Sequence, residues 1–282
     1  MKEFKRQYIA VLGMRITILV DNYATHLISL SKRLLSEWGF AAYIHDYRIL
    51  YDTGLSGTAL INNMRALGID PDEPNYLVIS HRHIDHTGGV KRFLEARSRP
   101  ITMIAHTNLF TKAYAKDERG NLEDISVDFT PEYLREKGVN LILIREPYKI
   151  TSEVVVSGEI PRKWGPPHLG AVTDEILDDM ALYIKHGNGL IAITGCGHAG
   201  VENIIEYGLQ ITGLDRLYAV IGGLHFLGLS DDRVRQVVKY LVQRSPGIVV
   251  GSHCTGILGM AALRDALPNA FRLGGVGVSI EL

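Results

Sequence analysis

The sequence predicts an α/β fold in which two mixed β-sheets pack against each other and helices flank both sheets. Strand-like segments follow one another closely early in the chain, whereas strand and helix patterns alternate later. This mixture favours two packed sheets over one doubly wound sheet. Although 282 residues exceed the usual domain size, α/β folds of this length are commonly one unit, so we expect a single domain spanning residues 1–282.

The expected elements follow from hydrophobic patterning and from turn residues. Apolar, partly β-branched runs predict strands at 14–20, 47–51, 76–80, 101–105, 140–144, 153–157, 180–185, 190–194, 217–221, 247–250 and 276–281. Helical patterns, ended in two cases by a glycine, predict helices at 56–67, 90–95, 131–137, 200–211 and 231–243. Segments 116–130 and 158–179 lack periodicity and are expected to be loops, of which the Pro-rich second one is a candidate to cover a site.

The composition limits the classes of function. Apolar residues make up 46% of the chain and the formal net charge is -1, which allows a sizeable core and disfavours a protein that binds nucleic acid through bulk charge. Two cysteines do not form a disulfide framework, and the charged start Met1–Gln7 does not resemble a secretory signal. No apolar run is long enough to span a membrane. We therefore expect a cytoplasmic protein with no nucleic-acid or membrane partner; the sequence carries no indication of its oligomeric state.

One short segment is rich in metal-binding side chains. His81-Arg82-His83-Ile84-Asp85-His86 directly follows the predicted strand 76–80 and precedes Gly88-Gly89. Because residues two apart in an extended segment point the same way, His81 and His83 are expected to share one cation. Asp85 and His86 lie beyond the bend and are expected to face a second cation. A surface His cluster is the alternative, but this spacing favours a dinuclear metal site.

Two further positions extend this motif into a family resemblance. His81-x-His83-x-Asp85-His86, Asp52 in Leu50-Tyr51-Asp52-Thr53-Gly54, and His253 at a late strand end resemble the metallo-β-lactamase superfamily. Segments 195–200, 222–225 and 253–256 are similar to a subgroup of proteins resembling 7,8-dihydropterin-6-methyl-4-(β-D-ribofuranosyl)aminobenzene-5'-phosphate synthase.

The resemblance implies an αββα sandwich with two divalent cations at one edge, between the sheets. It assigns His81 and His83 to the first metal, and Asp85, His86 and His253 to the second. Zinc is the expected ion, with manganese and iron as alternatives. Asp52 would orient a ligand or the loop backbone, unless it is simply a turn residue.

The chain departs from the superfamily pattern at the bridging ligand. The usual Thr-Gly-Asp is here Thr194-Gly195-Cys196, so Cys196 is either a thiolate ligand or a small buried side chain. His198 is expected to complete the first metal's shell, because the usual third His upstream is missing. Either Cys196 or an Asp such as Asp179 would complete the metal shell, whereas Cys254 is expected to point away from the metals.

His225 follows Gly222-Gly223 after a predicted strand and is a candidate to assist the leaving group or to stabilise an oxyanion. The glycine pair would allow a phosphate to approach the backbone, although a packed His is an equal alternative. The four remaining candidates have no site partners nearby in the sequence and are not expected to take part: His26, His45, His106 and His186.

These features favour a metal-dependent hydrolase in which Asp85 and His225 assist attack on a small-molecule ester, lactone, thioester or phosphoester, with phosphorylated substrates among the candidates. The subgroup resemblance implies an alternative, a condensing enzyme that joins a dihydropterin diphosphate to an arylamine ribosyl phosphate. A non-catalytic metal- or ligand-binding protein is a third possibility. A flavin-partnered di-iron oxidoreductase of the superfamily is disfavoured because it carries Glu where His83 stands, and a nuclease because it normally has an added domain and a basic surface.

Overall fold

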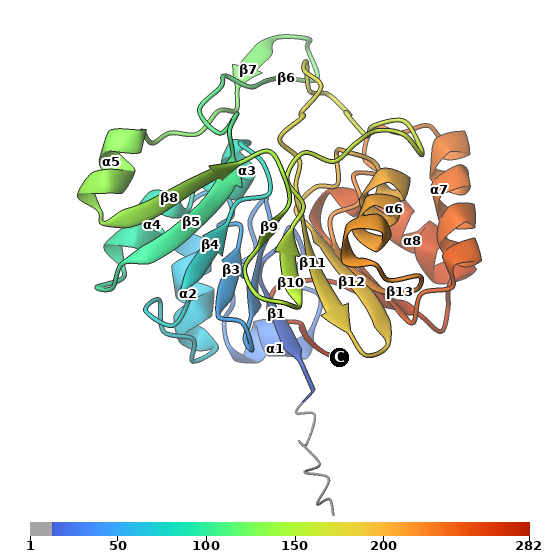
Figure 1. Cartoon of the computed structure of the whole chain (residues 1–282), viewed down its shortest axis with the longest axis horizontal. Helices are drawn as coiled ribbons and strands as arrows, with labels where there is room; N and C mark the ends of the chain where they lie inside the picture. Colours follow the sequence, from blue (N-terminus) through green and yellow to red (C-terminus); the bar gives the residue numbers. More distant parts are fainter. Residues whose placement is uncertain (1–12) are drawn as a thin grey trace, which may run out of the picture.

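Two seven-stranded sheets pack face to face in the structure, a computed structural model that describes residues 13–282 (Figure 1). Helices cover the outer side of each sheet, so the predicted fold class, two mixed sheets flanked by helices, is confirmed. The interpretation of Met1–Gln7 lies outside the described residues. Within residues 13–282, no helix has the length and hydropathy needed to cross a membrane.

The strands divide between the sheets largely by their position in the chain. The first sheet contains, in spatial order, β16 (Ser279–Glu281), β1 (Arg15–Val20), β2 (Ala41–Ile44), β3 (Ile49–Tyr51), β4 (Tyr76–Val78), β5 (Ile101–His106) and β8 (Val139–Ile144). The second contains β15 (Phe271–Leu273), β14 (Ile248–Gly251), β13 (Leu217–Gly222), β12 (Gly189–Thr194), β11 (Ala181–His186), β10 (Val154–Val156) and β9 (Tyr148–Lys149).

The helices lie on the outer faces and at the connections. Those near the first sheet are α1 (Leu27–Ser31), α2 (Thr58–Ala66), α3 (Ile84–Thr87), α4 (Val90–Glu95) and α5 (Pro131–Glu136). Those on the second are α6 (Val201–Thr212), α7 (Asp231–Arg244) and α8 (Gly256–Ala266), the last preceded by a short 3-10 turn, His253–Thr255.

Alternation along the strands builds three apolar layers. In β4, Val78 belongs to the layer between the two sheets, whereas Leu77 belongs to the layer under α2 and α4. In β12, Ile193 faces the central layer and Ala192 faces α6 and α7. Successive residues of a strand point to opposite faces, so an uninterrupted apolar strand is buried on both sides. This explains why most predicted strands carry no polar alternation.

Several elements differ from the prediction. The sequence pattern assigned no strand to β2, no helix to α8 and a loop to 116–130, part of which forms a small sheet from β6 (Tyr114–Lys116) and β7 (Leu122–Asp124). This hairpin is largely exposed and polar, so no hydrophobic period marks it. Gly259 weakens the helical pattern of α8, but a side chain there would collide with Phe226, 2.7 Å away. The predicted loop 158–179 is confirmed as free of regular helix or strand.

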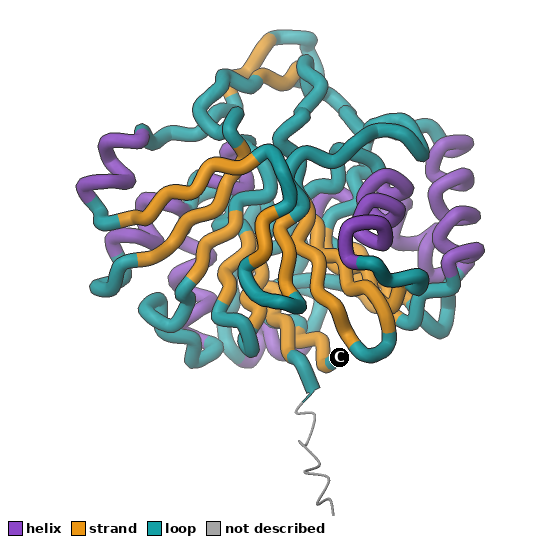
Figure 2. The backbone as a smooth tube through the Cα atoms, in the orientation of Figure 1, coloured by secondary structure: helices purple, strands orange, loops and turns teal. Residues whose placement is uncertain are grey.

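The direction of the strands determines where a site can form. Strands β3, β4, β5 and β8 run parallel to one another, as do β12, β13, β14 and β15. Parallel strands present their carboxyl ends at the same edge, where α/β proteins bind their ligands. Figure 2 shows loops and the β6–β7 hairpin rising above one edge of the two sheets.

Candidate metal centre

The residues singled out from the sequence lie at the carboxyl ends of these parallel strands. Asp52 follows β3, the His81–His86 motif follows β4, and segments after β12, β13 and β14 come from the opposite sheet. The two sheets therefore contribute the two halves of one cluster. The side chains from the second sheet are Cys196, His198, His225 and His253.

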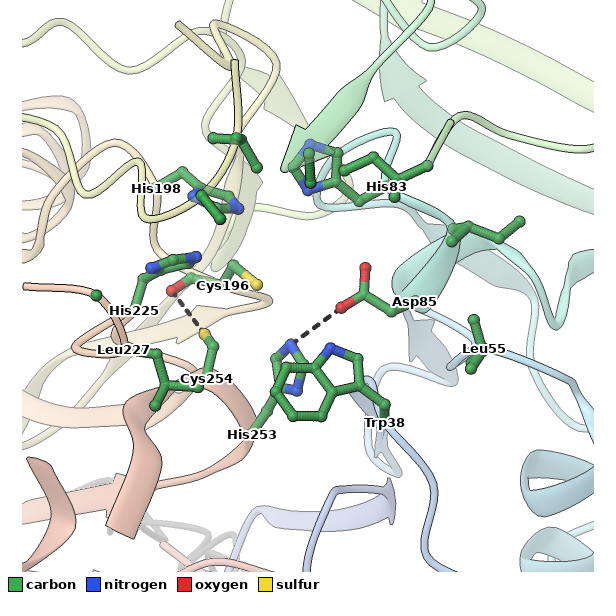
Figure 3. A pocket seen from close by; sticks show the side chains of 16 residues that line it. Trp38, Leu55, His83, Asp85, Cys196, His198, His225, Leu227, His253 and Cys254 are labelled. Carbon is green, nitrogen blue, oxygen red and sulfur yellow. Dashed lines mark hydrogen bonds and ion pairs between the residues drawn. The ribbon is translucent and has the colours of Figure 1, made fainter. Parts of the chain in front are cut away.

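These side chains surround one cavity of about 410 Å³ (Figure 3). His83 and Asp85 line it from the first sheet, and His198, His225 and His253 line it from the second. The predicted loop 158–179 contributes Ala171 and Val172 to its wall. This position is consistent with the prediction that the loop is a candidate to cover a site.

The first candidate metal group consists of His81, His83 and His198. One nitrogen from each of these buried rings lies within 4.8 Å of the others. Nε2 of His81 is 3.0 Å from Nδ1 of His83. Two nitrogen ligands of one tetrahedral zinc lie about 3.3 Å apart, so this spacing suits a shared cation.

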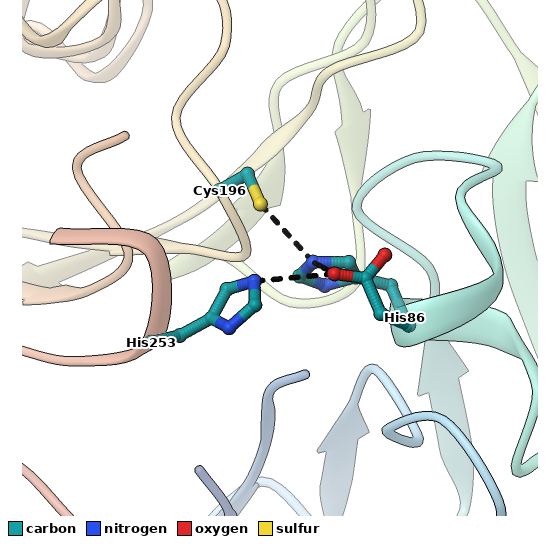
Figure 4. A group of neighbouring side chains, drawn as sticks. His86, Cys196 and His253 are labelled. Carbon is teal, nitrogen blue, oxygen red and sulfur yellow. Dashed lines mark hydrogen bonds and ion pairs between the residues drawn. The ribbon is translucent and has the colours of Figure 1, made fainter. Parts of the chain in front are cut away.

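The second candidate group consists of Asp85, His86, Cys196 and His253, whose ligand atoms also lie within 4.8 Å of one another (Figure 4). Nε2 of His86 lies 3.2 Å from Sγ of Cys196 and 3.7 Å from Oδ2 of Asp85. Nε2 of His253 lies 3.4 Å from the same carboxylate oxygen. One carboxylate, two imidazoles and one thiol thus converge on a single point, a donor set that suits zinc.

In four imidazoles, Nδ1 donates a hydrogen bond to a protein acceptor outside the candidate metal groups. His86 donates its Nδ1–H to Asp52 (2.7 Å), His198 donates to the carbonyl of His168 (2.8 Å), and His253 donates to Oδ1 of Asn22 (2.9 Å). His81 donates to the Ser80 hydroxyl at 2.9 Å, because that hydroxyl gives its own proton to Asp52.

These acceptors fix the proton on Nδ1 and leave the Nε2 lone pair facing the cluster. Nε2 of His198 and of His253 is buried with no hydrogen-bond partner. Orphaned buried nitrogens are rare in folded proteins, and metal-binding imidazoles usually donate their other nitrogen in this manner. The residues present therefore fit a pair of divalent cations.

Asp52 forms hydrogen bonds with both ends of the segment from Ser80 to His86. Its carboxylate accepts hydrogen bonds from the backbone N–H and the hydroxyl of Ser80, each at 2.7 Å, as well as from His86. Gly195 packs against this contact from the second sheet, since a Cβ there would lie 2.2 Å from the Ser80 hydroxyl and 2.6 Å from Asp52. These hydrogen bonds fix the orientation of the His86 ring and of Ser80.

The protonation states at neutral pH suit cation binding. Burial lowers the pKa of His83 to about 3 and holds the pKa values of His81 and His198 well below their usual range, so these rings are neutral. Burial opposes ionisation of Asp85, but His86 and His253 outweigh it and lower its pKa. Burial likewise opposes the charged form of His86, but Asp85 and Asp52 raise its pKa. A cation bound there would take the place of the His86 proton, whose charge Asp85 and Asp52 stabilise.

The backbone is strained at three of the strand ends. Asp52, His225 and His253 adopt positive φ angles of 58°, 46° and 45°, in the left-handed region that non-glycine residues rarely occupy. Such conformations cost about 1 kcal/mol or more each and cluster at functional sites. At these positions they turn the side chains toward the cluster.

Comparison with known proteins identifies the family. The model of the metallo-beta-lactamase superfamily matches residues 40–173. Tm1679, whose solved structure is described as a metal-dependent hydrolase of the beta-lactamase superfamily, superposes with a TM-score of 0.80 at 26% identity. That match covers 95% of this chain and 99% of Tm1679. The chain belongs to the metallo-β-lactamase superfamily.

Within the superfamily, two proteins of Methanocaldococcus jannaschii are similar over most of the chain. MJ0448, described as an uncharacterized protein, is 35% identical over 95% of this chain and 100% of its own length. The 7,8-dihydropterin-6-methyl-4-(beta-D-ribofuranosyl)-aminobenzene-5'-phosphate synthase is 28% identical over 74% of this chain and 76% of its own length. The predicted resemblance to that subgroup is confirmed.

Cys196 occupies the position at which this chain departs from the metallo-β-lactamase pattern. Its thiol joins the second group, and burial raises its pKa, so a cation would replace the thiol proton on binding. Asp179, the alternative ligand, belongs to none of the candidate groups formed by the described residues. Instead its Oδ2 accepts a hydrogen bond from the N–H of Ala199 at 2.7 Å and supports the loop that carries His198. Cys254 lines the cavity, but its thiol donates to the Cys196 carbonyl at 3.4 Å.

His225 lies beside the first group, with its ring centroid 4.2 Å from that of His198. Burial lowers its pKa to about 4, and its buried Nδ1 has no hydrogen-bond partner. Gly222 and Gly223 precede His225 and were predicted to let a phosphate approach the backbone, but they accommodate other backbone segments instead. A Cβ at Gly222 would lie 2.0 Å from the carbonyl oxygen of Thr194, and one at Gly223 would lie 2.3 Å from that of Gly195. Protein backbone fills the space that the sequence suggested for a ligand.

Sequence reasoning missed three groups that hydrogen-bond to the candidate ligands, namely Ser80, Asn22 and the backbone carbonyl of His168. Ser80 precedes the motif directly, so its position was a usable signal. Asn22 follows β1 and has no motif of its own, and His168 lies in an irregular loop. The four excluded residues are absent from the candidate groups that residues 13–282 form: His26, His45, His106 and His186.

Proposed function

We propose that the protein is a hydrolase that uses two divalent cations, with zinc as the favoured ion. His81, His83 and His198 would hold the first cation, and Asp85, His86 and His253 the second, with Cys196 replacing the usual bridging carboxylate. The observation that carries this proposal is the orientation of the imidazoles, whose Nδ1 protons are fixed by protein acceptors while their Nε2 atoms face the cluster.

When bound, the cations would supply Lewis-acid polarisation of the substrate and activation of a water nucleophile. The chain's own residues would set the geometry. Asp85 lies between His86 and His253, where its free oxygen can accept a hydrogen bond from the attacking water. His225, neutral at pH 7, would donate a hydrogen bond to the oxygen on which charge develops.

The cavity wall would exclude bulk water. Trp38 packs edge-on against the imidazole of His253 with 5.6 Å between ring centroids, and Leu55 and Leu227 line the same cavity. A dry, preorganised site strengthens the electrostatic interactions inside it. Small-molecule substrates are favoured because the reacting groups lie inside a pocket rather than on an open face.

Metal analysis of purified protein combined with a hydrolysis panel tests this proposal. We expect about two equivalents of zinc, manganese or iron, and metal-dependent hydrolysis of at least one ester, lactone, thioester or phosphodiester. His83→Ala should lose both metal and activity, whereas His26→Ala, at an exposed residue that belongs to none of the candidate groups, should keep both. Protein that binds no transition metal even after reconstitution would refute the proposal.

A condensing enzyme is the second candidate, and the similarity to the synthase of Methanocaldococcus jannaschii favours it. Incubation with a dihydropterin diphosphate and an arylamine ribosyl phosphate, followed by mass spectrometry, tests this reaction directly. A joined product would support the synthase and displace the hydrolase. Its absence from protein that hydrolyses an ester would exclude the synthase.

A further inference from the structure

The cavity beside the candidate metal groups has an unusual wall for a site that binds phosphorylated molecules. Apart from the cluster side chains and Cys254, the described residues that line it are apolar or glycine, with Trp38, Leu55, Ile84, Ile125 and Leu227 the largest. No Lys or Arg among residues 13–282 lines it. A substrate phosphate away from the metals would therefore lose water without gaining a cationic partner from this wall.

A second cavity, of about 580 Å³, continues from the first. The two share Trp38, Leu227 and Gly228. From there the second cavity passes over the start of α8 and is lined by Ile257 and Leu258, whose side chains are 69% and 82% exposed. Large apolar side chains this exposed lose water favourably when a ligand covers them.

Polar groups are few along this path. Asp231 and Arg235 lie at the side of the second cavity, but Arg235 pairs with Asp232 at 2.5 Å. The wall between His225 and the exposed face of α8 is thus mainly apolar, and its polar residues in the second cavity are Tyr23, Asp231, Arg235 and Thr255. Its starting point lies where the bond under attack would be held.

We propose that the natural substrate carries an unbranched apolar acyl chain on the scissile carbonyl, and that this chain lies in the groove formed by the two cavities. The proposal rests on the hydrolase function proposed above and specifies its substrate class. In the reaction, the oxygen of water bonds to the acyl carbon while the bond from that carbon to the leaving oxygen or sulfur breaks. The leaving group takes up a proton, and the products are a carboxylic acid and an alcohol or thiol.

A series of 4-nitrophenyl esters from acetate to octanoate tests the groove, with bis(4-nitrophenyl) phosphate in parallel. Burial of each added methylene is expected to raise kcat/KM by up to about fourfold, and partial exposure reduces this gain. We therefore expect kcat/KM for the octanoate ester to exceed kcat/KM for the butyrate ester by at least about tenfold. Equal rates along the series, or preference for the phosphodiester, would overturn the proposal.

Matched variants locate the effect in the groove. Leu258→Lys places a charge on the path of the chain, and because Leu258 is 82% exposed the change removes little packing. It should reduce the octanoate-to-acetate ratio by about tenfold. Leu30→Lys, on α1 and 77% exposed, lines neither cavity and should leave the ratio unchanged. Equal ratios in both variants and the parent would contradict the assignment.

A binding measurement separates this inference from the hydrolase proposal. The sequence has two tryptophans, so Trp164→Phe leaves Trp38, which lines both cavities, as the single emitter. Titration of this variant with octanoate should shift Trp38 emission to shorter wavelength, whereas acetate should not. The inference fails if octanoate leaves the emission unchanged. If the protein hydrolyses a phosphodiester in a metal-dependent way but does not bind octanoate, the hydrolase proposal stands and only the proposed acyl-chain groove is refuted.

Discussion

Asp52→Asn tests whether the contacts around Asp52 prepare the site for metal. The carboxylate accepts three hydrogen bonds, from the Ser80 N–H, the Ser80 hydroxyl and His86 Nδ1–H, each at 2.7 Å. An amide of the same shape has one accepting oxygen, and its nitrogen can only donate. At least one donor must therefore lose its acceptor, or His86 must move its proton to Nε2, where it would block metal binding.

The expected magnitudes follow from these contacts. One buried donor without an acceptor destabilises the folded protein by about 1 to 3 kcal/mol. Loss of an orienting partner lowers metal affinity by about 10- to 100-fold, which corresponds to about 1.4 to 2.7 kcal/mol. The loss should fall mainly on the second metal, because Asp52 contacts His86 directly and reaches His81 only through Ser80.

Zinc competition with a chromophoric chelator measures both affinities, and chemical denaturation of metal-free protein measures the stability change. Asp265→Asn is the matched control, since this exposed carboxylate pairs only with neighbouring Arg264 among the described residues. We expect the control to retain both zinc affinities. Unchanged zinc affinity and stability in Asp52→Asn would show that Asp52 does not orient the candidate ligands.

Three further predictions test other parts of the site. Removing metal with a chelator should lower the melting temperature by roughly 5 to 10 °C relative to protein at 100 times the zinc Kd, because binding contributes about 2.7 kcal/mol; identical melting curves would contradict the fit of the cluster to metal. Cys196→Ser should weaken zinc by about tenfold or more and remove the thiolate-to-metal absorption band of cobalt-substituted protein, and a parent spectrum without that band would exclude the thiol as a ligand. Gly195→Ala should destabilise the protein by about 1 to 3 kcal/mol because its Cβ would meet Ser80 and Asp52, whereas Gly187→Ala, with no atom within 4 Å, should be nearly neutral; equal denaturation midpoints would show that the sheets do not approach as described.

The half of the site that comes from the first sheet was predictable because its residues are contiguous. His81 to His86 occupy six positions after a buried strand, so spacing alone indicated which of these side chains lie together in one candidate group. The partners from the second sheet could be ranked only by family resemblance. Which of Cys196, His198 and Asp179 faces the cluster depends on the path of the loop after β12, and tertiary contacts such as the hydrogen bond from Ala199 to Asp179 determine that path.

The fold shows the same division between local and tertiary information. Buried strands such as β12 and amphipathic helices such as α7 carry strong patterns and were predicted to within about two residues. The β6–β7 hairpin was missed because exposed polar strands have no such pattern. Helix α8 was missed because Gly259 serves close packing against Phe226, a contact from another segment that local propensity does not reveal.

Anomalous diffraction at the zinc edge from crystals of zinc-loaded protein would locate the cations directly. We expect two peaks, one bounded by His81, His83 and His198 and the other by Asp85, His86 and His253, with the Cys196 thiolate bound to the second. A single peak would reduce the site to one metal. No peak among these residues, in protein whose zinc content has been verified, would show that this cluster is not a metal centre.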